Sequence, residues 1–436
     1  MDAASLAGLI LIVGMIVLIG VGLPIAIAIA LPCTISAIVL VGASGAPLVM
    51  TQRIFAANNS FVLLAIPFFI LAGVLMNNGG IAGRLVDLAK VLVGRAPAPL
   101  AQTSIAANAI FGAVSGASVA SAAAVGTILT PRMKKEGYDM KFAATVNVAA
   151  SPAGMLIPPS NTFIVYSLVS STSVSALFMA GIIPGLMWAA ACALVVAWYA
   201  RRMPDLPAQE RVTLRQALIV VWRALPALVM MLVVIGGLLA GYFTATESAV
   251  IAVLYALVFG LVTRSVVVRD LYGIVLTAAR TTGVIMLLVG VSGALSWILA
   301  YSRIPEQVAD FMLGISTNPT VILIIIMIVL LVAGTVMDPT PEILIFTPIF
   351  LPVVTQLGID PIHFGAMMVF NMSLGNISPP VGNNLFVGAK VGGVPVESVF
   401  TRILPFFAAL VVALFLVVFI PELSLWLPTM AGLVTP

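Results

Sequence analysis

The sequence predicts an all-α protein that crosses a membrane many times and is built from two structural repeats. Hydrophobic residues make up 62% of the 436 residues and charged residues only 8%, whereas soluble domains carry about 25% charged residues. Apolar runs of about 20 residues, long enough to cross the hydrocarbon core of a bilayer, recur along the chain. Shifting the sequence by 221 positions also aligns glycines, prolines and aspartates without a gap.

The apolar runs are the predicted membrane helices. They lie at 6–31, 61–76, 175–200, 225–243, 246–263, 281–300, 319–336 and 402–420. With shorter segments between them, we expect ten or more membrane elements in contact with the lipid bilayer. The first run follows Met1-Asp2 without a basic segment or a cleavage site of small residues, so we expect a retained helix and no signal peptide.

The residues that coincide after the shift are those that set turns and helix breaks. The pairs are Pro131 with Pro352, Gly137 with Gly358, Asp139 with Asp360, Gly154 with Gly375, Pro158-Pro159 with Pro379-Pro380, and Pro184 with Pro405. The two halves therefore share a chain path together with its interruptions. In a chain this apolar, such a pattern is typical of a transporter with two structural repeats.

The basic residues predict that the repeats are inverted. One loop of the first repeat contains Arg132, Lys134, Lys135 and Lys141, whereas the equivalent stretch 353–362 has no Lys or Arg. Because cytoplasmic loops are enriched in Lys and Arg, we expect the halves to cross the membrane in opposite senses. We predict a first repeat at 1–200, an arginine-rich cytoplasmic linker at 201–224 and a second repeat at 225–436.

Charge and cysteine content exclude other classes of function. The net charge of +4 is small and comes from loop residues, so it indicates no nucleic-acid partner. Cys33 and Cys192 lie inside apolar runs and are interpreted as buried packing residues. With His363 as its single histidine, the chain has no His/Cys cluster for a structural metal.

Each half contains two predicted helix breaks. The stretch 112–126 consists of small residues and hydroxyls, although a close packing face between helices is an alternative interpretation. In Gly154–Thr162 the Pro-Pro pair removes backbone donors, frees carbonyls upstream and disfavours helix at Ile157. Gly334–Asp338 and Gly375–Asn384 occupy the corresponding places in the second half.

Paired breaks inside a membrane predict a transport site. Freed carbonyls and hydroxyls are hard oxygen ligands that suit Na⁺, and helix N-termini after the prolines favour an anionic substrate. Asp338 is an ionisable residue within a predicted span, which indicates function; the alternative is an N-cap for a helix that begins at Pro339. Glu247 is interpreted as a helix-start residue and is left out of the site.

Several strings resemble the large membrane subunit of TRAP (tripartite ATP-independent periplasmic) transporters, the DctM-like family, over nearly the whole chain. They are FGAVSGASVASAAAVGTILTPRMKKEGYD, GMLIPPSNTFIVYS, GTVMDPTPEILIFTPIFLPV and SPPVGNNLFV. The resemblance implies sodium-coupled secondary transport of an organic anion across the bacterial inner membrane. It also implies an elevator-type fold, in which a transport domain with two re-entrant hairpins moves against a scaffold.

Two partners follow from the resemblance: a periplasmic substrate-binding protein and a small four-helix membrane subunit. The small subunit is expected as a separate polypeptide, because the chain has no extra N-terminal four-helix region.

The resemblance further implies two sodium sites and a substrate site. The first sodium site would lie near Ser115, Ser118, Gly154, Ile157 and Pro159, and the second near Thr335, Asp338, Gly375 and Pro380. Asn161, Thr162 and Asn383 are the candidate substrate contacts. Where sugar-acid transporters of this family have an aspartate, in a pattern like SGSAVAD, this chain has Ser121, so that residue's role does not carry over.

Two other classes of protein are alternatives. A stand-alone sodium–dicarboxylate symporter shares the two-repeat organisation and would need no partners. An intramembrane serine protease could use Ser115 with His363, but Ala113 breaks the Gly-x-Ser-Gly pattern and no other feature supports a dyad. We therefore expect a transporter and not an enzyme, and the sequence does not identify its organic anion.

Overall fold

The computed structural model describes residues 3–202, 213–379 and 381–434, and every regular element in these ranges is a helix. The first half contains α1 (Ala3–Gly20), α2 (Ile25–Asn58), η1 (Val62–Leu64), α3 (Ala65–Asn78), α4 (Ile81–Val93), α5 (Pro99–Ser115), α6 (Ser118–Lys135), α7 (Met140–Ala150), α8 (Ala153–Leu156), α9 (Asn161–Ser170) and α10 (Val174–Ala200). The second half contains α11 (Leu214–Leu239), α12 (Ala245–Val262), η2 (Val268–Asp270), α13 (Leu271–Tyr301), α14 (Ile304–Ile315), α15 (Pro319–Gly334), α16 (Pro339–Gln356), α17 (Pro361–Gly375), α18 (Asn383–Gly392), α19 (Glu397–Phe419) and α20 (Glu422–Met430). The predicted all-α fold is confirmed.

Seven described helices are long and apolar enough to span a membrane: α1, α2, α10, α11, α12, α13 with η2, and α19. An eighth candidate is the segment formed by η1 with α3 and by α4, which bends by 76° between its two parts. The remaining apolar segments are shorter because helix breaks divide them. The predicted run 6–31 is also two helices, since the chain turns at Gly22, with φ +85°, and α2 begins after Pro24.

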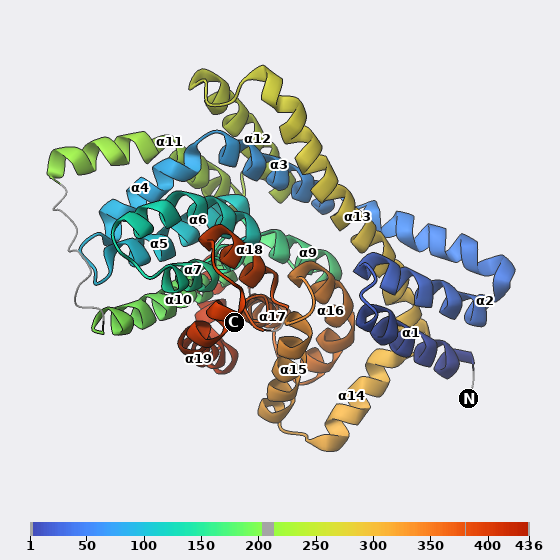
Figure 1. The fold of residues 1–436 in the computed structure, drawn as a ribbon. Coiled ribbons are helices and arrows are strands. Elements are labelled where there is room, and N and C mark those ends of the chain that lie inside the picture. Colours follow the sequence, from blue (N-terminus) through green and yellow to red (C-terminus); the bar gives the residue numbers. More distant parts are fainter. Residues whose placement is uncertain (1–2, 203–212, 380, 435–436) are drawn as a thin grey trace.

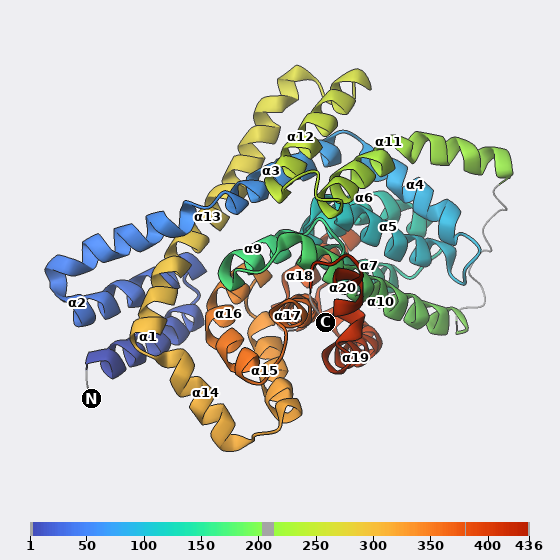
Figure 2. The ribbon, with the colours of Figure 1, turned by 180° about the vertical axis from the view of Figure 1, so that it is seen from behind.

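Two groups of helices are important for the site. The lateral helices α1, α2 and α13 pack together at one side, where the N-terminus lies (Figure 1). The central helices α5 to α9 and α15 to α18 pack on one another, and the view from behind shows the same separation (Figure 2). Elements from the two sequence halves thus interleave in the central group, as α6 with α18 and α9 with α16 do.

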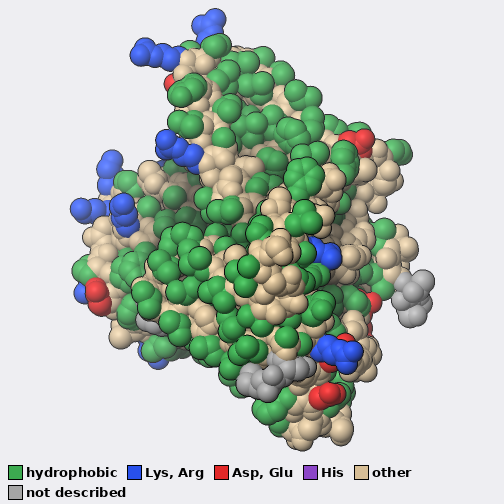
Figure 3. Space-filling model, turned by 90° about the vertical axis from the view of Figure 1, so that its right-hand side faces the viewer, with side chains coloured by type: hydrophobic (Ala, Val, Ile, Leu, Met, Phe, Trp, Pro, Cys, Tyr) green, Lys and Arg blue, Asp and Glu red, His purple; other side chains and the backbone are tan. Residues whose placement is uncertain are grey.

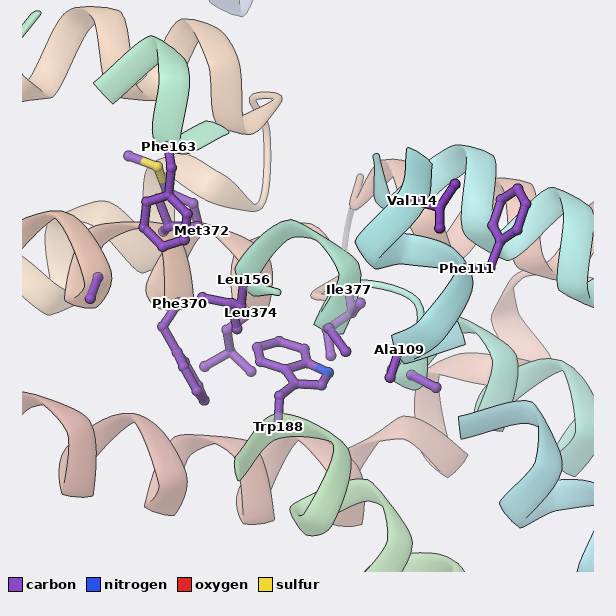
Figure 4. Close-up of a cluster of buried hydrophobic side chains, with 14 of the residues drawn as sticks. Ala109, Phe111, Val114, Leu156, Phe163, Trp188, Phe370, Met372, Leu374 and Ile377 are labelled. Carbon is purple, nitrogen blue, oxygen red and sulfur yellow. The ribbon is translucent and has the colours of Figure 1, made fainter. Parts of the chain in front are cut away.

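A buried tryptophan on α10, Trp188, packs against several of the central helices. The Nε1 of Trp188 donates to the carbonyl of Ala149, 2.8 Å away, and its ring centroid lies 5.0 Å from that of Phe370. Figure 4 shows Leu156 of α8 and Leu374 of α17 beside the same indole. The ends of α8 and α17 therefore pack against the same indole ring, and the two breaks begin directly after these contacts.

The outer surface is that of a membrane protein. Many large apolar side chains are exposed, such as Ile16, Leu194, Leu232 and Val332. In Figure 3 hydrophobic side chains cover most of the face in view, and the Lys and Arg side chains lie mainly toward its edges. This distribution fits a protein whose sides contact lipid.

Residues that the 221-residue shift aligns have the same backbone roles in both halves. Gly137 and Gly358 adopt positive φ values of +79° and +77°. Asp139 and Asp360 each cap the next helix, α7 and α17, with a side-chain oxygen. The two halves therefore share a local chain path, and their opposite orientation in the membrane stays a prediction.

The predicted linker 201–224 overlaps the start of α11. Residues 203–212 lie outside the described residues, and α11 begins at Leu214. Thr213 and Gln216 form a capping box at the start of this helix. Glu247 takes the equivalent place in the capping box of α12 with Thr244, so its interpretation as a helix-start residue is confirmed.

Candidate functional site

The first half contains a helical hairpin whose tip meets the Pro-Pro segment. α5 ends at Ser115 and α6 begins at Ser118, with Gly116 at φ +62° between them. A Cβ on Gly116 would lie 3.1 Å from the carbonyl oxygen of Pro159. The predicted break in 112–126 is thus a tight turn placed against a second break.

A pair of glycines holds this hairpin close to the second break. A Cβ on Gly112 would lie only 2.3 Å from the Cα of Gly154, and one on Gly154 only 2.2 Å from the Cα of Gly112. Two backbones can approach this closely only where neither residue has a side chain. Ile157 then leaves the helix in an extended conformation, φ −80° and ψ 125°, as expected for a residue before proline.

One of the carbonyls freed by the prolines is satisfied locally. The carbonyl of Met155 accepts hydrogen bonds from the hydroxyls of Ser160 and Thr162, the latter at 3.1 Å. The two hydroxyl oxygens also lie 2.6 Å apart. The expectation of freed carbonyls open to a ligand therefore does not hold at Met155, because hydroxyls in the same break occupy it.

The second half repeats the arrangement. α15 ends at Gly334, α17 ends at Gly375, and a Cβ on Gly375 would lie 2.6 Å from the Cα of Gly334. The carbonyl of Thr335 accepts a hydrogen bond from the backbone N of Gly382, at 3.2 Å, which ties the two breaks together. Pro380, a candidate ligand in this segment, lies outside the described residues.

Asp338 has the backbone position of an N-cap without the capping hydrogen bond. It precedes α16 with φ −70° and ψ 151°, yet its side chain accepts nothing from that helix. Pro341, the third residue of the helix, lacks one of the two N–H groups that a cap can use. Instead, Oδ1 of Asp338 accepts a hydrogen bond of 2.6 Å from Nδ2 of Asn383, which joins two candidate site residues.

These breaks surround a cavity of about 1240 Å³. Of the candidate site residues, Ser115, Ser118, Asn161, Thr162 and Asp338 line it, whereas Gly154, Ile157, Pro159, Thr335, Gly375 and Asn383 do not. The other walls come from α2, α3, α13 and η2, whose Arg269 and Asp270 also line the cavity. The cavity therefore lies where the central helices face the lateral ones.

Three of the central helices begin at the cavity. The first residues of α6, α9 and α16, namely Ser118, Asn161 with Thr162, and Pro339 to Pro341, all contribute to its lining. The N-terminus of a helix carries a partial positive charge and unpaired N–H groups. Their convergence makes the cavity suited to a negatively charged group.

Asn376 is a site residue that the sequence analysis missed. It is buried, it lines the cavity, and its Nδ2 donates to Oγ of Ser118, 3.1 Å away in the other half. The 221-residue shift aligns Asn376 with Met155, an apolar residue, so the repeat gave no indication of it. Its position directly after Gly375, in a polar segment that contains a Pro-Pro pair, could have indicated that it belongs to the site.

Ser121 belongs to packing and not to the cavity. It is fully buried, and its hydroxyl lies 2.8 Å from Oδ1 of Asn108, whose Nδ2 donates to Oδ1 of Asn147 at 3.0 Å. This satisfied chain of polar groups joins α5, α6 and α7. The residue at the departure from the family pattern thus has a structural role.

Ser115 and His363 do not form the catalytic dyad that an intramembrane protease would need. Nδ1 of His363 lies 2.6 Å from Oγ of Ser424, and its Nε2 lies 3.3 Å from the carbonyl oxygen of Val418. The hydroxyl of Ser115 instead donates to the carbonyl of Ala117. Within the described ranges, no three His, Cys, Asp or Glu side chains are grouped for a metal ion.

Comparison with known proteins identifies the family. Residues 12–423 match the family model described as "Tripartite ATP-independent periplasmic transporter, DctM component". The C4-dicarboxylate TRAP transporter large permease protein DctM of Pseudomonas aeruginosa is 39% identical over 382 residues, 87% of this chain and 89% of that protein. The isethionate TRAP transporter permease protein DctMQ of Oleidesulfovibrio alaskensis is 36% identical, over 89% of this chain and 61% of that longer protein.

A solved structure supports the fold. The YdaH transporter of Alcanivorax borkumensis superposes with a TM-score of 0.61 at 14% identity, covering 86% of this chain and 88% of that one. At this identity the similarity concerns the fold alone. From the family match and the relatives, the chain belongs to the DctM family of tripartite ATP-independent periplasmic transporters, as a multi-pass large permease component and not an enzyme.

Proposed function

We propose that the chain performs sodium-coupled symport of a small organic acid anion across the bacterial inner membrane. The observation that carries the proposal is the cavity at which α6, α9 and α16 all begin. Three helix N-termini bring positive partial charge to the cavity, and the basic residue Arg269 also lines it. A carboxylate or sulfonate fits that environment, and Asn161, Thr162 and Asn383 are its proposed side-chain contacts.

The class of substrate agrees with the relatives. Their printed names give C4-dicarboxylate for one and isethionate for another, both small organic anions. A site formed by helix ends and amides accepts either type of anionic group. We therefore propose the class of substrate and not one compound.

Two sodium ions would bind beside the anion, one at each pair of breaks. The first site is proposed near Ser115, Ser118, Gly154, Ile157 and Pro159, and the second near Thr335, Asp338, Gly375 and Pro380. At both places a glycine crossing brings backbone carbonyl oxygens of neighbouring segments close together, and such hard oxygen ligands suit an alkali cation.

Alternating access would come from an elevator-type movement of the central helices against the lateral ones. Support for this comes from the position of the cavity, whose walls include α2 and α13 on one side and the four breaks on the other. Inverted repeats can present one site to either face of the membrane. The lateral helices would then form part of the scaffold.

Two partners complete the proposal: a periplasmic substrate-binding protein that delivers the anion, and a small four-helix membrane subunit. The family description contains the word tripartite, and the relative named DctMQ is a longer chain than this one.

Reconstitution tests the partners. The substrate is first identified as the ligand that co-purifies with the proposed binding protein, and its uptake into liposomes is measured. Uptake should require the chain, the small subunit and the binding protein together. Uptake at the full rate by the chain alone would instead support the stand-alone symporter.

A further inference from the structure

Glu342 is a buried acidic residue without a partner. It is the only Asp or Glu among the buried polar residues of the ranges 3–202, 213–379 and 381–434. None of its surface is exposed, and neither carboxylate oxygen has a hydrogen-bond partner. An isolated carboxylate inside a membrane protein is costly, so this position requires a compensating ligand or proton.

The carboxylate lies at the crossing of α15 and α17. A Cβ placed on Gly334 would lie 3.1 Å from Oε2 and 3.5 Å from Oε1 of Glu342, and also 3.1 Å from the Cα of Gly375. A side chain at position 334 would therefore enter the space that the carboxylate faces. Glycine at this position keeps the crossing accessible to both carboxylate oxygens.

Glu342 also lies one helical turn behind the cavity wall. Its backbone N donates to the carbonyl of Asp338, 3.2 Å away, and the residues between them, Pro339 to Pro341, line the cavity. Asp338 is exposed and accepts a hydrogen bond from Asn383, whereas Glu342 is enclosed and accepts none. The start of α16 thus carries two carboxylates in different environments.

Two amide oxygens on neighbouring segments have no donor either. Oδ1 of Asn371 on α17 and Oδ1 of Asn376 after it are buried and without a hydrogen-bond partner. Their nitrogen atoms are in use, because Asn371 donates to the carbonyl of Met327 and Asn376 to Ser118. Oxygens that lack donors are the groups that a hard cation requires.

We propose that Glu342 supplies a carboxylate ligand to a Na⁺ ion at the Gly334–Gly375 crossing. The inference rests on the sodium coupling proposed above and adds to the second sodium site a residue that the family resemblance did not assign. The carboxylate compensates the charge of the ion within the protein, and the ion provides the partner that both oxygens lack. Removing this charge weakens Na⁺ binding without removing a structural hydrogen bond.

Thermal unfolding of the purified full-length protein tests this assignment without relying on transport. Unfolding is followed over a series of NaCl concentrations, with KCl holding the total salt constant. Wild-type protein should unfold at higher temperature as Na⁺ rises, because an ion that binds the folded state stabilises it. Glu342→Gln preserves the shape of the side chain and should raise the half-saturating Na⁺ concentration by about tenfold or more.

A matched control is Glu247→Gln, since Glu247 is an exposed glutamate in the capping box of α12 and does not line the cavity. It should leave the Na⁺ midpoint at the wild-type value. In KCl alone, Glu342→Gln should be at least as stable as wild type, because it no longer buries a group that needs a counter-ion. If Glu342→Gln does not fold, Glu342→Asp withdraws the carboxylate from Gly334 and should raise the midpoint about threefold or more.

The outcomes separate this inference from the proposed function. An unchanged Na⁺ midpoint in folded Glu342→Gln, or in Glu342→Asp if only that variant folds, overturns the assignment and leaves sodium coupling intact. If Na⁺ stabilises no variant, wild type included, and uptake is independent of Na⁺, the proposed function itself fails.

Discussion

The crossing of Gly112 and Gly154 gives the sharpest test of how the hairpin tip is held. Gly154→Ala places a methyl group 2.2 Å from the Cα and 2.7 Å from the carbonyl carbon of Gly112. Carbon atoms in contact lie about 3.5–4.0 Å apart, so the two backbones would have to separate by roughly 1.3 Å. Both neighbours are backbone atoms that no rotamer change can move.

The expected cost lies at or above the upper end of the overpacking range, about 3 kcal/mol. The shift also displaces Gly116 from Pro159, and a misplacement of about 1 Å at a site can reduce activity about 100-fold. We expect Gly154→Ala to lower the unfolding temperature and to reduce the rate of uptake by about that factor. Scanning fluorimetry on purified protein and uptake into liposomes measure the two effects.

The matched control is Gly83→Ala in α4, where a Cβ would meet no atom within 4 Å. Alanine favours a helix over glycine by about 1 kcal/mol, so this variant should be as stable as wild type or more so. Wild-type stability and uptake in Gly154→Ala would refute the close crossing and the argument built on it.

The remaining predictions concern the second sodium site and the orientation of the repeats. Asp338→Asn should fold normally, because asparagine can still accept the hydrogen bond from Asn383. It should need at least about tenfold more Na⁺ for half-maximal uptake. The reason is that two unit charges about 4 Å apart attract each other by about 1 kcal/mol in water and about 4 kcal/mol near a protein surface. An unchanged sodium titration would return Asp338 to a purely structural role. Single cysteines at the exposed positions Lys135 and Gln356, in a background free of native cysteines, should react with an impermeant reagent from opposite sides of the membrane. Labelling of both from the same side would refute the inverted repeat.

Backbone chemistry made the breaks predictable from the sequence. Glycine and proline act through the local chain, so Gly116, Ile157 and the segment before α16 depart from helix where the sequence indicates. Hydropathy located the long spans for the same local reason. However, the residues around the turn at Gly22 are also apolar, so hydropathy predicted a single run where α1 ends and α2 begins.

Partners distant in the sequence could not be predicted. Asn376 reaches Ser118 across 258 positions, and that contact depends on how the two halves pack. The hydrogen bond from Ser160 to the carbonyl of Met155 could not be predicted either. The sequence shows that this carbonyl is freed and that hydroxyl donors are near it in the chain, but it does not show their positions in space. Thus the sequence indicated where the helix breaks fall, and the fold determined which of their polar groups remain available.

Sodium-coupled uptake is the central claim, and one measurement tests it most directly. The chain is reconstituted in liposomes with the small subunit and the loaded binding protein, and uptake of the labelled anion is followed under an inward Na⁺ gradient, an inward proton gradient with K⁺ replacing Na⁺, and ATP without either gradient. We expect accumulation with the Na⁺ gradient alone. Accumulation that continues at the same rate without Na⁺, with the proton gradient substituting fully, would contradict the proposal.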